Sequence, residues 1–335
     1  MAAKRNETEY MYSSARVRSL ENRIAGAERL SHMADAESSA AIIANLSDLG
    51  FEVITDANGD FCREETLATL LIEGYSEAEK MVDDADFLNF LRYGYDCHNV
   101  KTLIKCFFRG VDSSTMLIPL GSVTVERLAE AYKNKDYSCL PENMAEAARV
   151  AEEAFAATSN PQKVDLILDR ACYADMLKNA EKYSIPLALK LVKTKIDLTN
   201  LISTTRLSLM KLGAGATSFL NEVLIEGGYI ETSYWTEGFS AGLGKLAEGL
   251  EYSGYSSLAS YLSGAVSLGE LERAADNMWL GIAKEAKYVP FGAEVLIGYL
   301  IALEYEVKNI RILLAGKDAE LARDVIRERL RESYV

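Results

Sequence analysis

The stretch Tyr305-Glu306-Val307-Lys308-Asn309-Ile310-Arg311-Ile312-Leu313-Leu314 is the centre of a segment, Glu294 to Lys317, around which this 335-residue chain is organised. The segment starts shortly after Pro290, and the fixed φ of proline suits the first turn of a helix. Its apolar residues recur mostly at steps of three and four, which is a helical period, and Gly316 is a natural stop. The sequence therefore predicts one long helix over 291–315.

Much of this pattern occurs a second time, and a fainter copy lies between the two. The matching residues are Tyr95, Asp96, Asn99 and Lys101 in the first copy, Asp197 and Asn200 in the second, and Tyr305, Glu306, Asn309 and Arg311 in the third. The asparagines are 101 and 109 residues apart, close to a third of the chain. This spacing indicates three helical units of roughly a hundred residues each. Chance is the alternative, because the motif is short and the middle copy lacks the aromatic and the base.

The repeated asparagine follows an acid on a largely apolar helix face. A buried side-chain amide without a partner costs roughly 1–3 kcal/mol. We therefore expect Asn99 and Asn309 to bind a neighbouring helix or main chain and to fix its register. An exposed asparagine is the alternative interpretation.

Composition favours an all-α protein, because prolines number only five and strong helix formers are plentiful. By its length the chain is expected to form two or three lobes rather than one compact domain. The start of the chain is crowded with charges and shows no secretory pattern. The apolar run Val295 to Leu303 is nine residues, far short of the roughly 20 that span a bilayer. Five cysteines without a Cys-x-x-Cys pair favour reduced thiols in a cytoplasmic protein.

The net charge of −14 argues against nucleic acid as a partner and against direct insertion into or adhesion to anionic lipid. Eleven acids stand against two bases between Glu52 and Asp86. A solvated helical face explains this segment more simply than a dedicated docking surface does. Any association with a membrane is therefore expected to run through a protein partner.

Helix signals along the chain predict the remaining elements. Predicted helices cover 10–30, 34–49, 63–72, 77–90, 161–182, 186–212, 269–287 and 318–332. A linker containing Pro119 and Gly121 precedes Ser122 or Thr124 as a helix cap. Eleven of the 22 glycines lie between Gly213 and Gly269, where short helices and tight loops are expected. Bulk at one of these glycines, as in Gly228→Trp, is expected to weaken partner binding and to leave the helical content intact.

Catalytic patterns are weak. The segment Gly238-x-Ser240-x-Gly242 fits a nucleophile elbow, but an elbow needs a preceding strand and a later histidine, and both histidines, His32 and His98, lie upstream. Gly244-Lys245 and Gly316-Lys317 lack the remaining residues of a phosphate-binding loop. Two histidines and scattered cysteines form no transition-metal pattern. No catalytic residue, metal site or cofactor is predicted.

Five stretches together resemble the C subunit of V-type and A-type ATP synthases, known as the d subunit in eukaryotic vacuolar ATPases. They run from end to end of the chain in the order expected for that family, although no single one is specific. They are Tyr10-x-x-x-x-Ala15-Arg16-Val17-Arg18-x-Leu20-Glu21, Tyr95-Asp96-x-His98-Asn99-Val100-Lys101, Asp169-x-x-x-Tyr173, Glu304-x-Glu306-Val307-Lys308-Asn309-Ile310-Arg311 and Ile326-Arg327-x-x-Leu330.

The resemblance implies a funnel-like, all-helical protein without a catalytic site, built of three similar helical lobes with pseudo-threefold symmetry. We expect the lobes to cover 1–115, 116–212 and 213–335. The resemblance also implies a rotor component on the cytoplasmic face of the membrane, which joins the membrane rotor ring to the central stalk, whose other members are the D and F subunits, so that ring and stalk turn together in proton or sodium transport. Two alternatives remain, namely a helical-repeat scaffold for other soluble partners and a helical hydrolase that uses Ser240.

Overall fold

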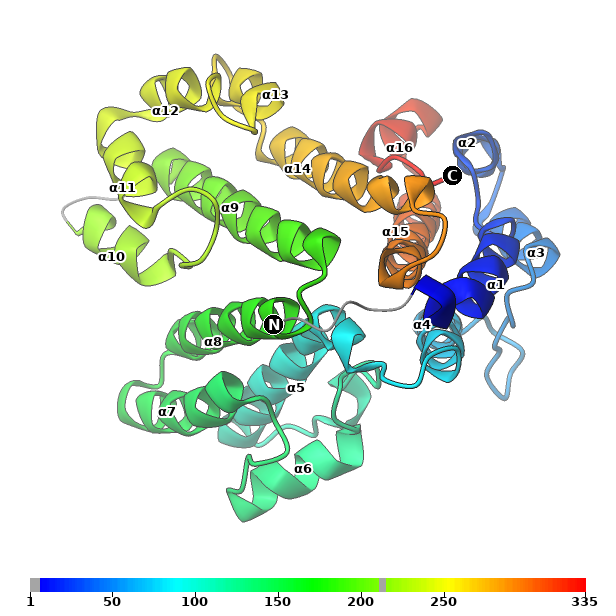
Figure 1. The fold of residues 1–335 in the computed structure, drawn as a ribbon, viewed down its shortest axis with the longest axis horizontal. Coiled ribbons are helices and arrows are strands. Elements are labelled where there is room, and N and C mark those ends of the chain that lie inside the picture. The colour runs from blue at the N-terminus through cyan, green and yellow to red at the C-terminus, as the bar shows by residue number, and fades with distance from the viewer. Residues whose placement is uncertain (1–6, 211–214) are drawn as a thin grey trace. The chain divides into compact units, whose positions relative to one another are not determined.

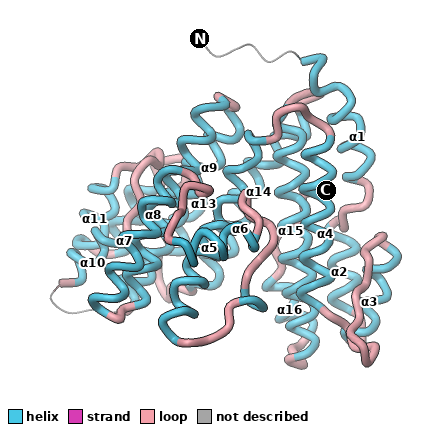
Figure 2. Tube along the Cα trace, turned by 90° about the horizontal axis from the view of Figure 1, so that it is seen from below, coloured by secondary structure: helices cyan, strands magenta, loops and turns pink. Residues whose placement is uncertain are grey.

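The computed structural model describes residues 7–210 and 215–335, and its regular elements within these ranges are helices (Figures 1 and 2). Outside the helices it contains one isolated antiparallel bridge, between Thr55 and Phe61. The predicted all-α class is confirmed. The principal helices are α1 (Met11–Glu21), α2 (Ala27–Asp35), α3 (Ser39–Asp48), α4 (Arg63–Lys80), α5 (Asn89–Arg109), α6 (Val125–Asn134), α7 (Glu142–Thr158), α8 (Pro161–Tyr183), α9 (Pro186–Leu209), α10 (Ala216–Val223), α11 (Thr232–Ala241), α12 (Leu243–Leu250), α13 (Ser256–Ala259), α14 (Leu268–Ala283), α15 (Ala293–Asp318) and α16 (Arg323–Arg329).

The chain divides into two compact units. Unit 1 combines both terminal parts of the sequence, Met1–Asp86 and Asp276–Val335, and unit 2 is the continuous segment Phe87–Ala275. The predicted division into 1–115, 116–212 and 213–335 has different boundaries, and the boundary at 212/213 lies outside the described residues. Three lobes with pseudo-threefold symmetry stay a prediction.

Helix α15 is the core of unit 1. Eighteen of its 26 residues are buried, and they occupy every side of the helix rather than one stripe. A helix that is apolar all round must be enclosed by other elements. Helices α1, α2, α3, α4 and α16 all pack against it. The sequence predicted this helix. Its enclosure results from the packing of the N-terminal helices and α16 against it.

Unit 2 has its main core between α5, α7 and α8, with α6 beside α5. Buried apolar residues from these four helices form one cluster, which includes Ile104, Leu128, Met144 and Leu168. Helix α9 packs against α8, and α10 and α11 pack against α9. The short helices α10 to α13 occupy the glycine-rich part of the sequence, as predicted.

Several predicted boundaries are wrong for identifiable reasons. The helix predicted over 10–30 is two helices, because Gly26 is extended (φ −70°, ψ 170°) and caps α2. The helices predicted over 63–72 and 77–90 are wrong in their bounds: α4 runs without a break to Lys80, and a loop with a short 3₁₀ turn, Asp86–Leu88, separates it from α5. Gly316 does not stop α15: it is buried, and a Cβ there would lie 2.8 Å from Ile326 Cγ1, so glycine permits the close approach of α16.

The chain after α16 is extended rather than helical, although a helix was predicted to 332. Leu330 is extended (φ −64°, ψ 144°), and the main chain of Arg331 binds the side chain of Asn309. The end of the helix predicted to Leu212 lies outside the described residues, and α9 is assigned to Leu209. Thr124 caps α6 as expected, since its hydroxyl accepts a hydrogen bond from Arg127 N.

Candidate functional site

The repeated acid and asparagine form the same arrangement in three helices. We call it a clasp: two side chains, three residues apart on one helix, that bind main-chain groups outside that helix. Clasp 1 is Asp96 and Asn99 on α5, clasp 2 is Asp197 and Asn200 on α9, and clasp 3 is Glu306 and Asn309 on α15. All six side chains are buried, with at most 4% of any residue exposed.

Each asparagine binds both polar groups of one main-chain residue. In clasp 1, Asn99 Nδ2 donates to Ile118 O and Asn99 Oδ1 accepts from Ile118 N, both at 2.8 Å. Asn200 binds Ile225 in the same way, at 2.8 and 2.9 Å. Asn309 binds Arg331, at 3.2 and 2.8 Å. The side-chain amide thus pairs with the main chain in the way that a residue of an adjacent β-strand would, because it offers one donor and one acceptor side by side.

The acids of clasps 1 and 2 bind the same loops a few residues further on. Asp96 accepts from Ser122 N at 2.9 Å, from Ser122 Oγ at 2.6 Å and from Val123 N at 3.2 Å. These residues lie four and five positions after Ile118, the partner of the asparagine.

Clasp 2 repeats this offset. Asp197 accepts from Tyr229 N at 2.8 Å and from Ile230 N at 3.2 Å, four and five positions after Ile225. The hydroxyl of Tyr255 donates a third bond to Asp197, at 2.6 Å. Clasps 1 and 2 therefore share one geometry, including the spacing within the bound loop.

Glycines are required where these loops pass the acids. A Cβ at Gly121 would lie 2.1 Å from Asp96 Oδ1, and one at Gly228 would lie 2.1 Å from Asp197 Oδ1. Real Cβ atoms essentially never approach another atom this closely. Gly228→Trp is therefore expected to push the loop off clasp 2, so its effect on partner binding could not be separated from its effect on the fold.

Sequence reasoning missed the bound loops, although a signal for them exists. The segments Leu117-Ile118-x-x-Gly121-x-Val123 and Leu224-Ile225-x-x-Gly228-x-Ile230 agree at every defined position apart from the valine–isoleucine exchange. They lie 107 residues apart, close to the 101 residues between Asn99 and Asn200. A comparison of the segments that follow each asparagine would have revealed them.

The electrostatics of the clasps follow from burial. Desolvation raises the pKa of Asp96 and of Asp197, while the donated hydrogen bonds oppose the rise. Burial raises the pKa of Glu306 to about 7, and the bond from Ala25 N and the charge of Arg29 oppose it. Each acid accepts hydrogen bonds from main-chain or side-chain donors, which is the chemistry of a structural support.

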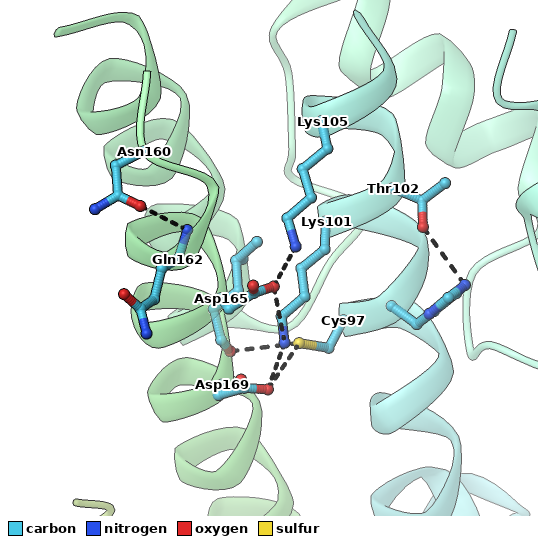
Figure 3. Close-up of polar contacts among 10 residues, drawn as sticks. Cys97, Lys101, Thr102, Lys105, Asn160, Gln162, Asp165 and Asp169 are labelled. Atoms are coloured by element: carbon cyan, nitrogen blue, oxygen red, sulfur yellow. Dashed lines mark hydrogen bonds and ion pairs between the residues drawn. The ribbon is translucent and has the colours of Figure 1, made fainter. Parts of the chain in front are cut away.

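The other repeated residues join these helices to neighbours. Lys101 Nζ lies 2.6 Å from Asp169 Oδ1 and 3.8 Å from Asp165 Oδ1, and Lys105 Nζ lies 2.5 Å from Asp165 Oδ1, so two lysines of α5 face two aspartates of α8 (Figure 3). Tyr95, one residue before clasp 1, is half-buried.

In unit 1 the corresponding base, Arg311, and the corresponding aromatic, Tyr305, also bind neighbouring helices. Arg311 Nη2 lies 2.8 Å from Glu64 Oε2 on α4. Tyr305 is buried, its hydroxyl donates to Asp276 O at 2.8 Å, and its ring stacks on Trp279. Helices α5 and α15 are thus fixed both by main-chain bonds at their clasps and by ion pairs to neighbouring helices.

Residues from the other motif stretches also hold helices together. Tyr173 on α8 shares a hydrogen bond of 2.9 Å with Thr199 on α9. Arg18 on α1 binds Glu21 and donates to the carbonyl oxygens of Ala286 and Val289, just before α15.

The hydrolase hypothesis finds no support in the geometry. Ser240 lies in α11, and its hydroxyl donates to Thr236 O one turn earlier, at 3.0 Å. No strand precedes it among residues 215–239, so the arrangement is not a strand–turn–helix elbow. In the described ranges, no group of three or more His, Cys, Asp or Glu side chains could hold a metal ion.

The comparisons with known proteins agree with these motifs. The sequence model of the ATP synthase (C/AC39) subunit family matches residues 13–329. The chain belongs to this family. It is 26% identical to the C subunit of the A-type ATP synthase of Methanocaldococcus jannaschii, over 96% of this chain and 86% of that protein. It is also 26% identical to the C subunit of the V-type sodium ATPase of Enterococcus hirae, over 72% of this chain and 73% of that one.

The family match, over residues 13–329, includes α5, α9 and α15, the three helices that carry the clasps. A third relative, the C subunit of the A-type ATP synthase of Thermococcus kodakarensis, is 23% identical over 96% of this chain and 90% of its own length. No helix of the described C/AC39 chain is long and apolar enough to cross a membrane.

Proposed function

We propose that this chain is the non-catalytic central-stalk subunit of a V/A-type rotary ATPase, and that it couples the soluble stalk to the membrane rotor ring during proton or sodium transport. The observation that carries the proposal is the family match over residues 13–329, together with C-subunit relatives aligned over 96% of the chain. Its partners would be the protein of the rotor ring and the D and F subunits of the stalk. Its location would be the cytoplasmic face of the membrane, held there through the ring.

The structure supports this role through stiffness. A coupling subunit must transmit torque, so its helices must not shear against one another. The clasps join α5, α9 and α15 each to a separate stretch of main chain by buried hydrogen bonds, which are directional and resist sliding. Ion pairs such as Lys101–Asp169 and Arg311–Glu64 add contacts between neighbouring helices.

The test is co-purification of the tagged full chain with a detergent-solubilised rotor ring and with the D and F subunits. We expect all of them to elute together in size-exclusion chromatography. A chain that elutes alone under conditions where the ring and stalk remain intact would contradict the proposal. A scaffold for unrelated soluble partners predicts that negative outcome.

We further propose that the glycine-rich segment contributes to ring binding, and a matched pair of substitutions tests this point. Gly254 and Gly281 both have open space where a Cβ would be added. Gly254 lies within the glycine-rich segment, and Gly281 lies in α14. Gly254→Trp is expected to weaken ring binding more than Gly281→Trp, with the far-ultraviolet circular dichroism of both unchanged. Equal ring binding by the two variants would exclude the segment from the interface.

A further inference from the structure

Clasp 3 differs from the other two in the way its acid is bound. In clasps 1 and 2 the acid and the asparagine bind one continuous loop. In clasp 3, Asn309 binds Arg331, whereas Glu306 Oε1 accepts from Ala25 N at 2.7 Å. The two halves of the bound main chain therefore come from opposite ends of the sequence.

The position of Ala25 matches that of the second donor in the other clasps. Val123 and Ile230 each donate to the acid and are followed by the N-cap of a helix, Thr124 before α6 and Glu231 before α11. Ala25 likewise donates to Glu306 and is followed by Gly26, the N-cap of α2. Helix α2 thus follows the donor residue of clasp 3 in the way that α6 and α11 follow the donor residues of clasps 1 and 2.

Two segments close clasp 3 together. We call Leu330–Val335 the strap and Ile24–Gly26 the junction. Ser333 Oγ in the strap donates to Ala25 O in the junction at 2.7 Å, and an added Cβ at Gly26 would meet Val335 O at 4.0 Å. The strap is also bound to α14, through Arg331 Nε to Asp276 Oδ2 and Glu332 N to Asn277 Oδ1, each at 2.9 Å.

The acid of clasp 3 receives less support than its counterparts. Asp96 and Asp197 each accept three hydrogen bonds from the loops and side chains around them. Among the described residues, the structure gives Glu306 one main-chain donor, Ala25 N, and only 4% of Glu306 is exposed to water. Burying an ionised carboxylate is costly unless donors or a counter-charge replace its water.

The charged groups around Glu306 offset its burial only in part, because its pKa stays raised. The positive charge of Arg29 on α2 lowers the pKa of Glu306. In the strap, Arg331 is paired with Asp276 and Glu332 with Lys284. Three further charged side chains shift the pKa of Tyr299, which lies two turns before Glu306 on α15. Glu77 from α4 raises it, and Arg16 from α1 and Arg23 from the α1–α2 loop lower it.

We propose that the strap and the junction form a pH-sensitive latch on unit 1, which stays closed while Glu306 is protonated and opens locally when Glu306 is ionised. Opening exposes the carboxylate to water and separates both segments from α15. The loops of clasps 1 and 2 lack this behaviour, because each is continuous and supplies several donors to its acid.

The sign of the pH dependence follows from the two states. In the closed latch, burial raises the pKa of Glu306 to about 7, from an ordinary value of 4.5. The open latch therefore loses the proton at lower pH than the closed one. Between these values each pH unit favours opening by about tenfold. Above about pH 7 both states are ionised and the dependence ends.

Amide hydrogen exchange of the purified full chain tests the proposal, with protection factors corrected for base-catalysed intrinsic exchange. Between pH 5 and pH 7 the protection of peptides covering 24–26 and 330–335 is expected to fall by about tenfold per pH unit, and to level off by pH 8. In Glu306→Gln the same peptides are expected to be more protected and nearly independent of pH, because the amide keeps an acceptor for Ala25 N without the charge. Peptides covering Ile118 and Ile225 are expected to be the same in both proteins.

Equal pH dependence of the strap in wild type and Glu306→Gln would overturn the latch, as would a change spread evenly over unit 1. Ser333→Ala supplies a second test that does not alter the acid. Because Ser333 joins the two segments, its loss is expected to lower the protection of 24–26 and 330–335 together at every pH. A change in one segment alone would show that they do not open as one.

Discussion

The most direct test of the clasps is Asn200→Ala. Asn200 is 1% exposed and binds both main-chain groups of Ile225, which is itself 4% exposed. The substitution leaves a buried N–H and a buried C=O without their partner. Each unsatisfied group costs about 1–3 kcal/mol, so the free energy of unfolding is expected to fall by about 2–6 kcal/mol. A loss of about 3 kcal/mol corresponds to a melting temperature lower by about 6–12 °C for a unit of this size.

Urea unfolding followed by circular dichroism measures this loss, and Asn134→Ala is the matched control. Asn134 is an exposed asparagine at the end of α6, so its replacement is expected to change stability by less than about 0.5 kcal/mol. Asn200→Asp adds a second prediction, because it keeps the acceptor for Ile225 N but places a carboxylate oxygen against Ile225 O. It is expected to be at least as destabilising as Asn200→Ala at pH 7 and less so at pH 4. If Asn200→Ala and Asn134→Ala unfold at the same urea concentration, the clasp does not support the fold.

Three further outcomes follow from the same geometry. Gly228→Ala places a Cβ 2.1 Å from a clasp carboxylate and is expected to cost about 1–3 kcal/mol, whereas Gly254→Ala, with open space around it, is expected to cost less than about 0.5 kcal/mol; thermal melting compares the two. Because the pKa of Glu306 is raised on folding to about 7, its contribution to stability is greatest below pH 4.5 and is lost as the pH rises towards 7. Glu306→Gln is therefore expected to be more stable than wild type, by an amount that grows to about 3 kcal/mol at pH 8. Urea unfolding at each pH measures this difference. A double-mutant cycle with Lys101→Met and Asp169→Asn is expected to give a coupling of about 0.5–1 kcal/mol that weakens with added salt, and a coupling that is unchanged in high salt would contradict an ion pair.

The positions of the clasp side chains could be anticipated because helices have a fixed period. An acid and an asparagine three residues apart must lie on one face of a helix, whatever that helix packs against. This local rule was enough to single out Asp96 with Asn99 and Glu306 with Asn309. The weaker copy at Asp197 and Asn200 was found through spacing along the chain.

The partners of these side chains could not be anticipated in the same way. The bond from Ala25 to Glu306 joins residues 281 positions apart, and nothing local to Ala25 announces it. The break between α1 and α2 depends on that bond and on the extended Gly26, so a helix predicted from apolar periodicity ran through it. The same holds for the strap, where the chain is extended over the last three residues of a predicted helix and Arg331 N donates to Asn309 Oδ1.

The sequence by itself determined that this protein is helical, that a long helix lies near residues 291–315, and that an acid–asparagine pattern recurs three times, because these properties depend on residue type and on a period of 3.6. Only the tertiary structure decided that the two ends of the chain share one unit, that glycines face the carboxylates, and that one of three similar clasps is closed by two separate segments. These features depend on which main-chain groups meet in space, and a buried polar side chain specifies that it needs a partner without specifying where along the chain the partner lies.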